Sequence, residues 1–288
     1  MAINTRVIKS RIKSVKNTKK ITKAMEMVSA AKMRKAVQAT LDSRHYATLA
    51  KELLARLAKS ANNPSVWTKE RQPKNVAVIL VTSNRGLCGS FNTNLFRKTR
   101  AILQTEYADA QISIIDIGKK SATFAKRFGY NLSAVYDTLN ERPQFTDILP
   151  IIEIMKQTYL DKTYDRVLLA STEYENSLLQ KPAIRQILPI MSTNDERPTA
   201  NDQTQTEFEP NQKVILDNIL PRLVETQLHH AILEASASEQ SARMVAMKKA
   251  SDAAGDMIGA LTLEFNKGRQ AAITQEIAEI AGGAAALA

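Results

Sequence analysis

Residues 5–59 read TRVIKSRIKSVKNTKKITKAMEMVSAAKMRKAVQATLDSRHYATLAKELLARLAK, a stretch without a single proline or glycine. Proline and glycine are the strongest helix breakers, so nothing in this stretch ends a helix. Apolar side chains recur along it at helical spacing: Ile8, Ile12, Val15, Ile21, Met25, Val28, Leu49, Leu53 and Leu57. We expect one helix from about residue 5 to about residue 59, roughly 80 Å long at about 1.5 Å per residue. A helix of that length must pack on a second long helix or lie inside a partner.

The C-terminal stretch supplies a matching helix. Between residues 213 and 287 the only proline is Pro221. Stripes at helical spacing indicate a packed seam, formed by Ala254, Ile258, Leu261 and Phe265 and then by Ile273, Ile277 and Ile280. Gly255 and Gly259 share one face, where small residues let two helices approach closely. The chain has no third long helix to complete a bundle, so we expect the two terminal helices to form a long antiparallel coiled coil.

The middle of the chain alternates between strand and helix patterns. Branched apolar runs predict strands at 74–83, 111–118, 132–139, 165–171 and 187–191, and helical patterns lie at 91–107, 119–128 and 147–160. This alternation is typical of a parallel sheet covered by helices, so we predict a Rossmann-like α/β domain with a mostly parallel sheet. We place that domain at residues 74–191, between coiled-coil helices at 1–60 and 212–288. The polar stretch 192–211 is predicted to be a loop.

Positive charge is concentrated in the N-terminal helix. Residues 1–59 hold 15 Lys or Arg and three acids, which makes +12, whereas the whole chain is +11, so the remaining residues carry −1. Such a segment is either a solvated helix face or a docking surface for an acidic partner. That partner could be a nucleic acid, an anionic lipid or an acidic protein surface.

Several other classes of protein are disfavoured by the sequence. Apolar runs such as 76–81 are too short to span a bilayer, and the N-terminus has no apolar core of a signal peptide. Cys88 is the only cysteine, so an internal disulfide is impossible. We therefore expect a mature protein on the cytosolic side of a membrane.

A turn with the sequence SNRGLCGS, at residues 83–90, follows a predicted strand and opens a predicted helix. Anion-binding loops occupy such positions, but this turn matches neither the Walker pattern nor the three-glycine dinucleotide pattern. Cys88 could serve as a nucleophile there, but His45, His229 and His230 are far from it in sequence. No spacing of Cys, His and acids suggests a metal site. The simplest interpretation of residues 83–90 is a tight turn between a strand and a helix.

Four motifs resemble those of one known family, in the same order along the chain. They are RIKSVKNTKKITKAMEMVSAAKMR at 11–34, RGLCG at 85–89, ASEQSARMVAM at 237–247 and NKGRQAAITQEIAEIAGGA at 266–284. Over essentially its whole length the chain is similar to bacterial-type gamma subunits of F-type, proton-translocating ATP synthases. It departs from the family pattern at Asn84, Ser90, Ala253 and Phe265, where Asp, Gly, Asn and Tyr are more usual. The cysteine-pair insertion of the chloroplast type is absent.

The resemblance implies a central rotor shaft, which couples proton-driven rotation of a membrane ring to conformational change at the catalytic β subunits. The chemistry then belongs to other subunits, and we expect no catalytic residue, cofactor or metal in this chain. The implied partners are three α and three β subunits, the ε subunit and the membrane c-ring. The implied location is the cytoplasmic face of a bacterial membrane, bound peripherally without insertion.

The resemblance also implies which side chains contact the catalytic subunits. Met25 would lie near an acidic lever segment of β, and Arg97 and Arg100 would face β as well. For these two arginines a plain solvated surface is the alternative. Arg269 and Gln270 would hydrogen-bond a loop of β. The small apolar tail at 282–288 would suit an apolar bearing.

Two other functions are compatible with parts of the sequence. A nucleic-acid-binding coiled coil would use the basic arm, but the arm contains one aromatic residue, Tyr46, for stacking on bases. A hydrolase would use Cys88, and its activity would be lost on Cys88→Ser.

Overall fold

A computed structural model describes residues 5–59, 65–140, 143–190 and 212–287 of the chain. The chain forms two compact units, one of residues 1–29 with 243–288 and one of residues 30–242. Two long helices, α1 (Thr5–Lys59) and α5 (Gln212–Leu287), contribute residues to both units. Their bounds agree with the helices expected from the sequence, while the three-part domain division stays a prediction. None of the described helices combines the length and hydrophobicity of a membrane span.

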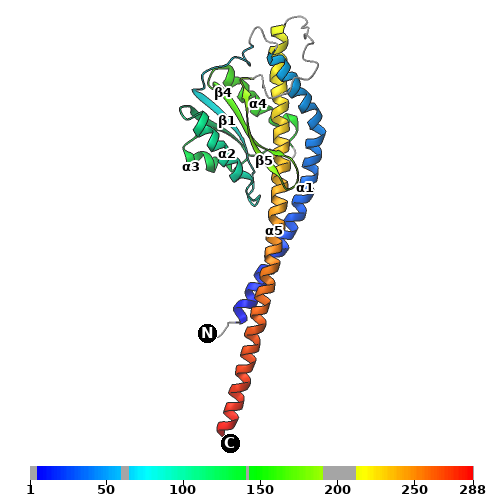
Figure 1. The fold of residues 1–288 in the computed structure, drawn as a ribbon, viewed down its shortest axis with the longest axis vertical. Coiled ribbons are helices and arrows are strands. Elements are labelled where there is room, and N and C mark those ends of the chain that lie inside the picture. The colour runs from blue at the N-terminus through cyan, green and yellow to red at the C-terminus, as the bar shows by residue number, and fades with distance from the viewer. Residues whose placement is uncertain (1–4, 60–64, 141–142, 191–211, 288) are drawn as a thin grey trace. The chain divides into compact units, whose positions relative to one another are not determined.

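The larger unit contains a five-stranded sheet in the order β3-β2-β1-β4-β5. Its strands are β1 (Asn75–Val81), β2 (Gln111–Ile117), β3 (Asn131–Tyr136), β4 (Arg166–Tyr174) and β5 (Gln180–Leu188). Pairing is parallel from β3 through β4 and antiparallel between β4 and β5. The helices α2 (Phe91–Glu106), α3 (Ser121–Phe128) and α4 (Phe145–Leu160) connect the parallel strands (Figure 1). The expected α/β class with a mostly parallel sheet is confirmed.

Side chains of β1 alternate between two cores, one on each face of the sheet. Val76, Val78 and Leu80 pack in a core that includes residues of α2 and α3. Ala77, Ile79 and Val81 pack in a second core with residues of α4, α1 and α5. A strand buried on both faces needs a continuous apolar run, which is why NVAVILV is recognisable from sequence.

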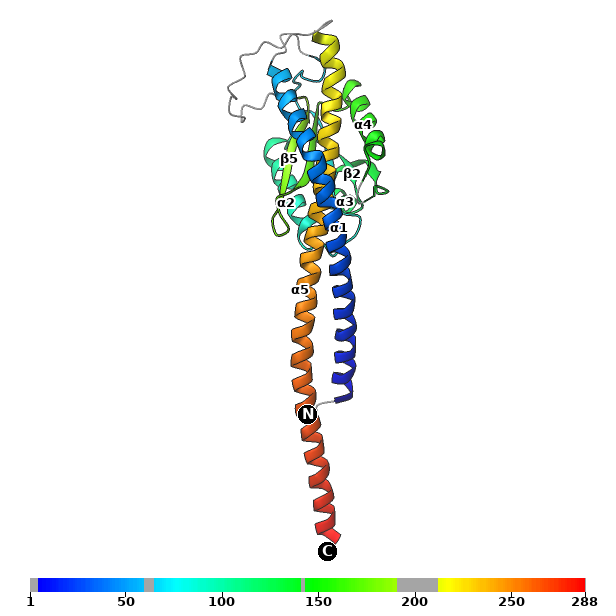
Figure 2. The ribbon, with the colours of Figure 1, turned by 90° about the vertical axis from the view of Figure 1, so that its right-hand side faces the viewer.

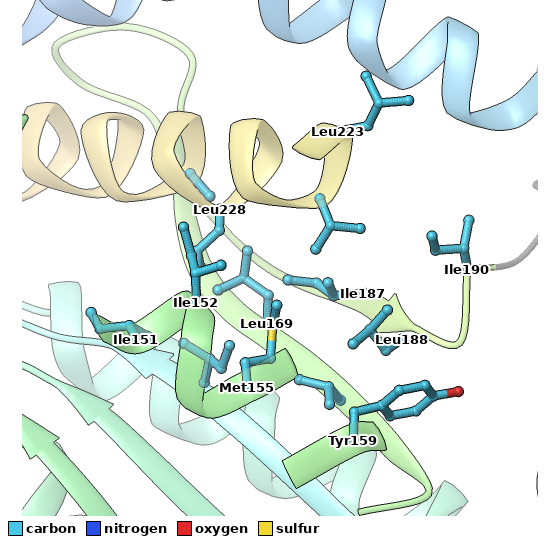
Figure 3. Close-up of a cluster of buried hydrophobic side chains, with 14 of the residues drawn as sticks. Ile151, Ile152, Met155, Tyr159, Leu169, Ile187, Leu188, Ile190, Leu223 and Leu228 are labelled. Carbon is cyan, nitrogen blue, oxygen red and sulfur yellow. The ribbon is translucent and has the colours of Figure 1, made fainter. Parts of the chain in front are cut away.

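The second core joins the sheet to the long helices of the larger unit. Ile152 and Met155 of α4, Leu169 of β4 and Leu228 of α5 converge in Figure 3. Each side chain of this kind that is fully buried stabilises the fold by about 1.5–3 kcal/mol. The core thus anchors this part of α5 to the sheet.

The last strand was placed wrongly by the sequence, which predicted 187–191. β5 runs from Gln180 to Leu188, and Met191 lies outside the described residues. Asn176 starts the hairpin by accepting the N–H groups of Leu178 and Leu179 on its side-chain oxygen, each at 2.9 Å. β5 is an edge strand that contains Pro182 and is partly exposed, so its sequence lacks a long apolar run.

In the smaller unit, the N-terminal part of α1 runs antiparallel to α5 (Figure 2). Buried side chains on α1 face the seam at Ile8, Thr22 and Ser29, and those on α5 at Met247, Ser251 and Ala254. A Cβ added at Gly255 would lie 2.9 Å from Nζ of Lys19, which is the end of a flexible side chain and not the backbone of α1, so close approach of the helices is not found there. At Gly259 an added Cβ meets nothing within 4 Å, so close approach at that position is not found.

The expected seam at Ile273, Ile277 and Ile280 does not form within the chain. These side chains are 48%, 61% and 73% exposed. In the smaller unit α5 continues past the first residues of α1, so no part of α1 covers this end (Figure 2). The apolar stripe is present on α5, but no described part of α1 covers it.

Candidate functional site

The turn after β1 is held by hydrogen bonds between its own residues and Asn92 of α2. Ser83 N–H donates to Oδ1 of Asn92 at 3.1 Å, and Asn92 Nδ2 donates to Ser83 Oγ at 2.7 Å. Cys88 is 3% exposed, and its sulfur lies 3.4 Å from the same Asn92 nitrogen. Its hydrogen-bond partners among the described residues include no histidine. This arrangement indicates a structural thiol.

The carboxyl edge of the sheet is tightly packed beside this turn. Gly118 follows β2 with φ of 112°, and a Cβ there would meet the Thr82 carbonyl oxygen at 2.3 Å. Asp116 is fully buried, and burial raises its pKa to about 6. Among the described residues, no cluster of three or more His, Cys, Asp or Glu could hold a metal ion.

Arg97 and Arg100 lie together on the exposed face of α2 and border a groove between α2 and α3. The groove has a volume of about 800 Å³ and is also lined by Lys120 and Arg127. The Arg100 guanidinium lies 4.4 Å from the ring centre of Phe128. The structure therefore places the two predicted arginines beside two cations that sequence reasoning missed, Lys120 just before α3 and Arg127 on α3.

Met25, Arg269 and Gln270 belong to the smaller unit. Met25 is half-buried, while Arg269 and Gln270 are exposed on α5. Neither of these two side chains has a hydrogen bond or ion pair with a described residue. Their hydrogen bonds to a loop of β stay a prediction.

The basic arm exposes apolar side chains as well as charge. Ile21, Met27 and Val28 are 61%, 60% and 54% exposed, although Thr22 and Ser29 beside them are buried. Exposed cations lie beside them and along the preceding turns of α1: Arg6, Lys9, Arg11, Lys13, Lys16, Lys19, Lys20 and Lys23. The nearby pair of Lys23 and Glu26, 3.0 Å apart, neutralises one of these cations. Exposed large apolar side chains gathered on one surface mark an interaction site rather than a plain solvated face.

Apolar exposure continues along α5 in the same unit. Leu263 is 74% exposed, and the stripe from Ile273 to Ile280 is exposed as described above. The apolar residues at helical spacing from Ile273 to Ile280 could have revealed this surface. Their spacing was interpreted instead as a seam packed inside the coiled coil. Both helices of the smaller unit therefore present apolar surface that no described residue covers.

Comparisons with known proteins agree with this geometry. A family model described as ATP synthase matches residues 4–287. The chain is 41% identical over 282 residues to an ATP synthase gamma chain of Legionella pneumophila (strain Corby), covering 97% of this chain and 98% of the relative. It is 42% identical over 286 residues to an ATP synthase gamma chain of Coxiella burnetii (strain CbuG_Q212), covering 98% of each.

A solved structure shares the fold at low identity. The Euglena gracilis mitochondrial ATP synthase rotor in rotational state 1 contains a chain that superposes with a TM-score of 0.68 at 19% identity. The match covers 93% of the present chain and 98% of the Euglena chain. The likeness extends over the long helices and the α/β sheet together.

Proposed function

The chain belongs to the family of ATP synthase gamma chains, the central-stalk subunits of the rotor, and we propose that it couples rotation of a membrane ring to catalysis in neighbouring subunits. It acts as a shaft and carries out no chemistry itself. Its turn after β1 lacks a phosphate-binding pattern, and the thiol there is buried. ATP is made and hydrolysed on the β and α subunits.

One observation carries this proposal: both long helices of the smaller unit leave apolar side chains exposed. Leu263 and Ile280 are 74% and 73% exposed, and Ile21 on α1 is 61% exposed. Large apolar side chains on helices in water are costly unless a partner covers them. Three α and three β subunits arranged around these helices provide that cover.

Coupling requires contacts that differ between rotational states. A shaft can shift a β subunit only as far as its contacts with the two conformations of that subunit differ in free energy. The exposed cations of α1 suit an acidic lever segment on β, because exposed ion pairs contribute only about 0–1 kcal/mol each. Many weak contacts guide rotation without stopping it at one angle.

Particular side chains take these contacts. Met25 lies near the β lever, Arg97 and Arg100 face β from the α/β domain, and Arg269 and Gln270 hydrogen-bond a loop of β. The α/β domain holds the ε subunit and rests on the c-ring. The assembly sits peripherally on the cytoplasmic face of a bacterial membrane.

Purification from native membranes tests the proposal. The chain is tagged in its own cell, membranes are solubilised in a mild detergent, and the co-purifying proteins are identified and assayed for ATPase activity. We expect α and β subunits in equal amounts and ATP hydrolysis by the complex. Recovery of nucleic acid, or of the chain without these subunits, would refute the rotor function.

Calorimetry on the isolated chain separately tests the proposal that this chain carries out no chemistry itself. We expect no stoichiometric ATP binding at micromolar affinity and no hydrolysis. Binding at that affinity would show a nucleotide site in this chain.

A further inference from the structure

Glu234 on α5 is a buried carboxyl with two arginines nearby and an ion pair with neither. Its side chain is 13% exposed, and its Oε1 lies 3.7 Å from Nε2 of His230. Burial raises the pKa of Glu234, while Arg185 of β5 and Arg44 of α1 lie near enough to lower it. Among the described residues, neither guanidinium forms an ion pair with this carboxyl. A buried carboxylate needs either a cation or a proton to neutralise it, so this group has two alternative states.

Arg185 is bound instead by Glu173 on β4. Its Nη2 donates to Oε1 of Glu173. Side chains of a strand alternate between the two faces of a sheet. Ile184 packs in the core on the α2 and α3 face, so Arg185 beside it points to the α5 face, as does Glu173, four residues after the buried Leu169. The Arg185 side chain is 57% exposed, so it can turn from one carboxyl to another without disturbing the core.

The protonation of Glu234 changes near neutral pH. Burial raises its pKa to about 7, against the opposing effects of Arg185 and Arg44 and with a contribution from Glu173. Arg185 opposes the shift more strongly than Arg44 does, which makes it the cation best placed to follow the charge of Glu234. Below pH 7 the carboxyl is neutral and needs no cation. Above pH 7 it carries a charge whose burial is costly unless a cation moves to it.

The histidines beside Glu234 are engaged elsewhere. Burial lowers the pKa of His230 to about 4, so its ring is neutral when Glu234 titrates. Nε2 of His229 contacts the carbonyl oxygen of Pro143 at 3.1 Å. A pocket of about 570 Å³, lined by both histidines and by Ser43 among others, opens beside the pair. The proton that leaves Glu234 therefore passes to water.

We propose that Arg185 is a two-position switch operated by one proton: it pairs with Glu173 while Glu234 is protonated, and it turns to Glu234 when that carboxyl gives its proton to water. In the second position an ion pair joins β5 to α5, and it exists only above about pH 7. Glu173, which is 23% exposed, is then neutralised by solvent instead. The inference goes beyond the proposed function, because it concerns contacts within this chain.

A double-mutant cycle on the full-length chain tests the exchange of partners. Arg185→Gln, Glu173→Gln and their double variant are unfolded in urea at pH 6 and at pH 8.5. The coupling is the difference between the midpoint shift of the double variant and the sum of the single shifts. The cycle is repeated in Glu234→Gln, whose side chain does not ionise. Lys119 and Asp137, an ion pair of 3.1 Å that is also partly exposed, provide the matched control cycle.

At pH 6 we expect strong coupling in the parent, so the double variant should unfold close to the midpoint of either single variant. At pH 8.5 the coupling should fall at least threefold, and the single shifts should add. In the Glu234→Gln background and in the control cycle, the coupling should be the same at both pH values. Unchanged coupling between Arg185 and Glu173 in the parent would overturn the switch, as would a loss of coupling at pH 8.5 in the Glu234→Gln background.

Nuclear magnetic resonance of the arginine Nε–H groups follows the same event in the folded chain. The Arg185 signal, assigned by its absence from Arg185→Gln, should shift with a midpoint near pH 7 in the parent and stay constant in Glu234→Gln. Arg44→Gln should keep this titration, because Arg44 is not the cation that moves. A constant Arg185 signal from pH 6 to pH 8.5 would overturn the proposal even if some variants are too unstable for the cycle. Neither measurement needs other subunits, so the result is independent of the rotor proposal.

Discussion

Ser43 on α1 and His230 on α5 contact each other in the larger unit, with 2.8 Å between Oγ and Nδ1. The Ser43 hydroxyl also donates to the Thr40 carbonyl at 3.1 Å. A hydroxyl has one hydrogen, so Ser43 must accept from the ring, and the His230 proton is assigned to Nδ1. Nε2 is then free of hydrogen and lies 3.7 Å from Oε1 of Glu234.

The pKa shifts of this pair agree with that assignment. Burial lowers the pKa of His230 to about 4, and the nearby cations Arg44 and Arg185 and the neighbouring His229 act in the same direction. Burial raises the pKa of Glu234 to about 7, with Glu173 adding to the effect and Arg185 and Arg44 opposing it. Between these two values both groups are neutral, so they form a polar contact without an ion pair.

Ser43→Ala should destabilise the larger unit. The substitution leaves the buried Nδ1–H of His230 without its acceptor, at a cost of about 1–3 kcal/mol in the free energy of unfolding. Urea denaturation at pH 7.5 measures it. Thr48→Ala is the control, because Thr48 is exposed and bonds only to the Arg44 carbonyl of its own helix. Equal stability of the two variants would mean that the contact contributes nothing.

Glu234→Gln should change how stability depends on pH. In the parent, the folded pKa of Glu234 lies near 7 and above its ordinary value of 4.5, so the stabilisation is full below pH 4.5 and is lost as pH rises through 7. Glutamine does not titrate, so the stability of the variant relative to the parent should rise between pH 4.5 and 7 and then level off. The lowered pKa of His230 makes stability rise with pH in the same range. This contribution is present in both proteins, so it largely cancels in the difference between them.

Unfolding free energies at four pH values between 4.5 and 8 measure this difference. Glu106→Gln, at an exposed position at the end of α2, serves as the control and should show much less change with pH. A flat difference for Glu234→Gln would show that this carboxyl ionises normally in the fold.

Gly118→Ala should damage the α/β sheet severely. The new Cβ would lie 2.3 Å from the Thr82 carbonyl oxygen, at a φ of 112° that side chains rarely adopt. Because that neighbour is backbone, β1 or β2 must move, and we expect a loss of about 3 kcal/mol or more. Thermal unfolding and soluble yield report it. Gly86→Ala, where a Cβ meets nothing within 4 Å, should unfold close to the parent temperature.

Arg269→Ala/Gln270→Ala should slow the assembled complex without preventing its assembly. Neighbouring helix positions point about 100° apart, so these exposed side chains can hold two sides of one loop. Losing one charge-assisted bond costs about 1.5–3 kcal/mol, which is roughly tenfold or more in a rate if it acts on the limiting step. Turnover and ATP synthesis are measured beside Lys267→Ala, an exposed control on the same helix. Parental turnover in the double variant would remove both residues from the site.

Local patterns were enough to predict most elements of the fold. The absence of breakers through residue 59 predicted α1, and the run NVAVILV predicted β1. β5 was misplaced because most of its residues are only partly buried, so its sequence QKPAIRQIL mixes polar residues and a proline with the apolar ones and resembles a loop. The start of β5 is set by the turn at Asn176 and by antiparallel pairing with β4. Pairing is a contact between two strands, so the pattern of consecutive residues in β5 does not reveal it.

The candidate site was only partly predictable for the same reason. Arg97 and Arg100 were named individually through a resemblance, whereas Lys120, Phe124, Arg127 and Phe128, which line the same groove, were not. These residues belong to a different crossover of the sheet. They meet α2 only because β1 and β2 are neighbours and place α2 and α3 on one face.

The sequence by itself determined the elements, the concentration of positive charge and the family, because helix breakers, apolar periodicity and motifs are properties of consecutive residues. Only the tertiary structure decided which face of each helix is covered. Ile21 is 61% exposed and Thr22 is 9% exposed, although hydrophobicity alone predicts the reverse. Periodicity reveals that a helix has an apolar stripe, but the position of the neighbouring helix decides whether that stripe packs within the chain or is left for a partner.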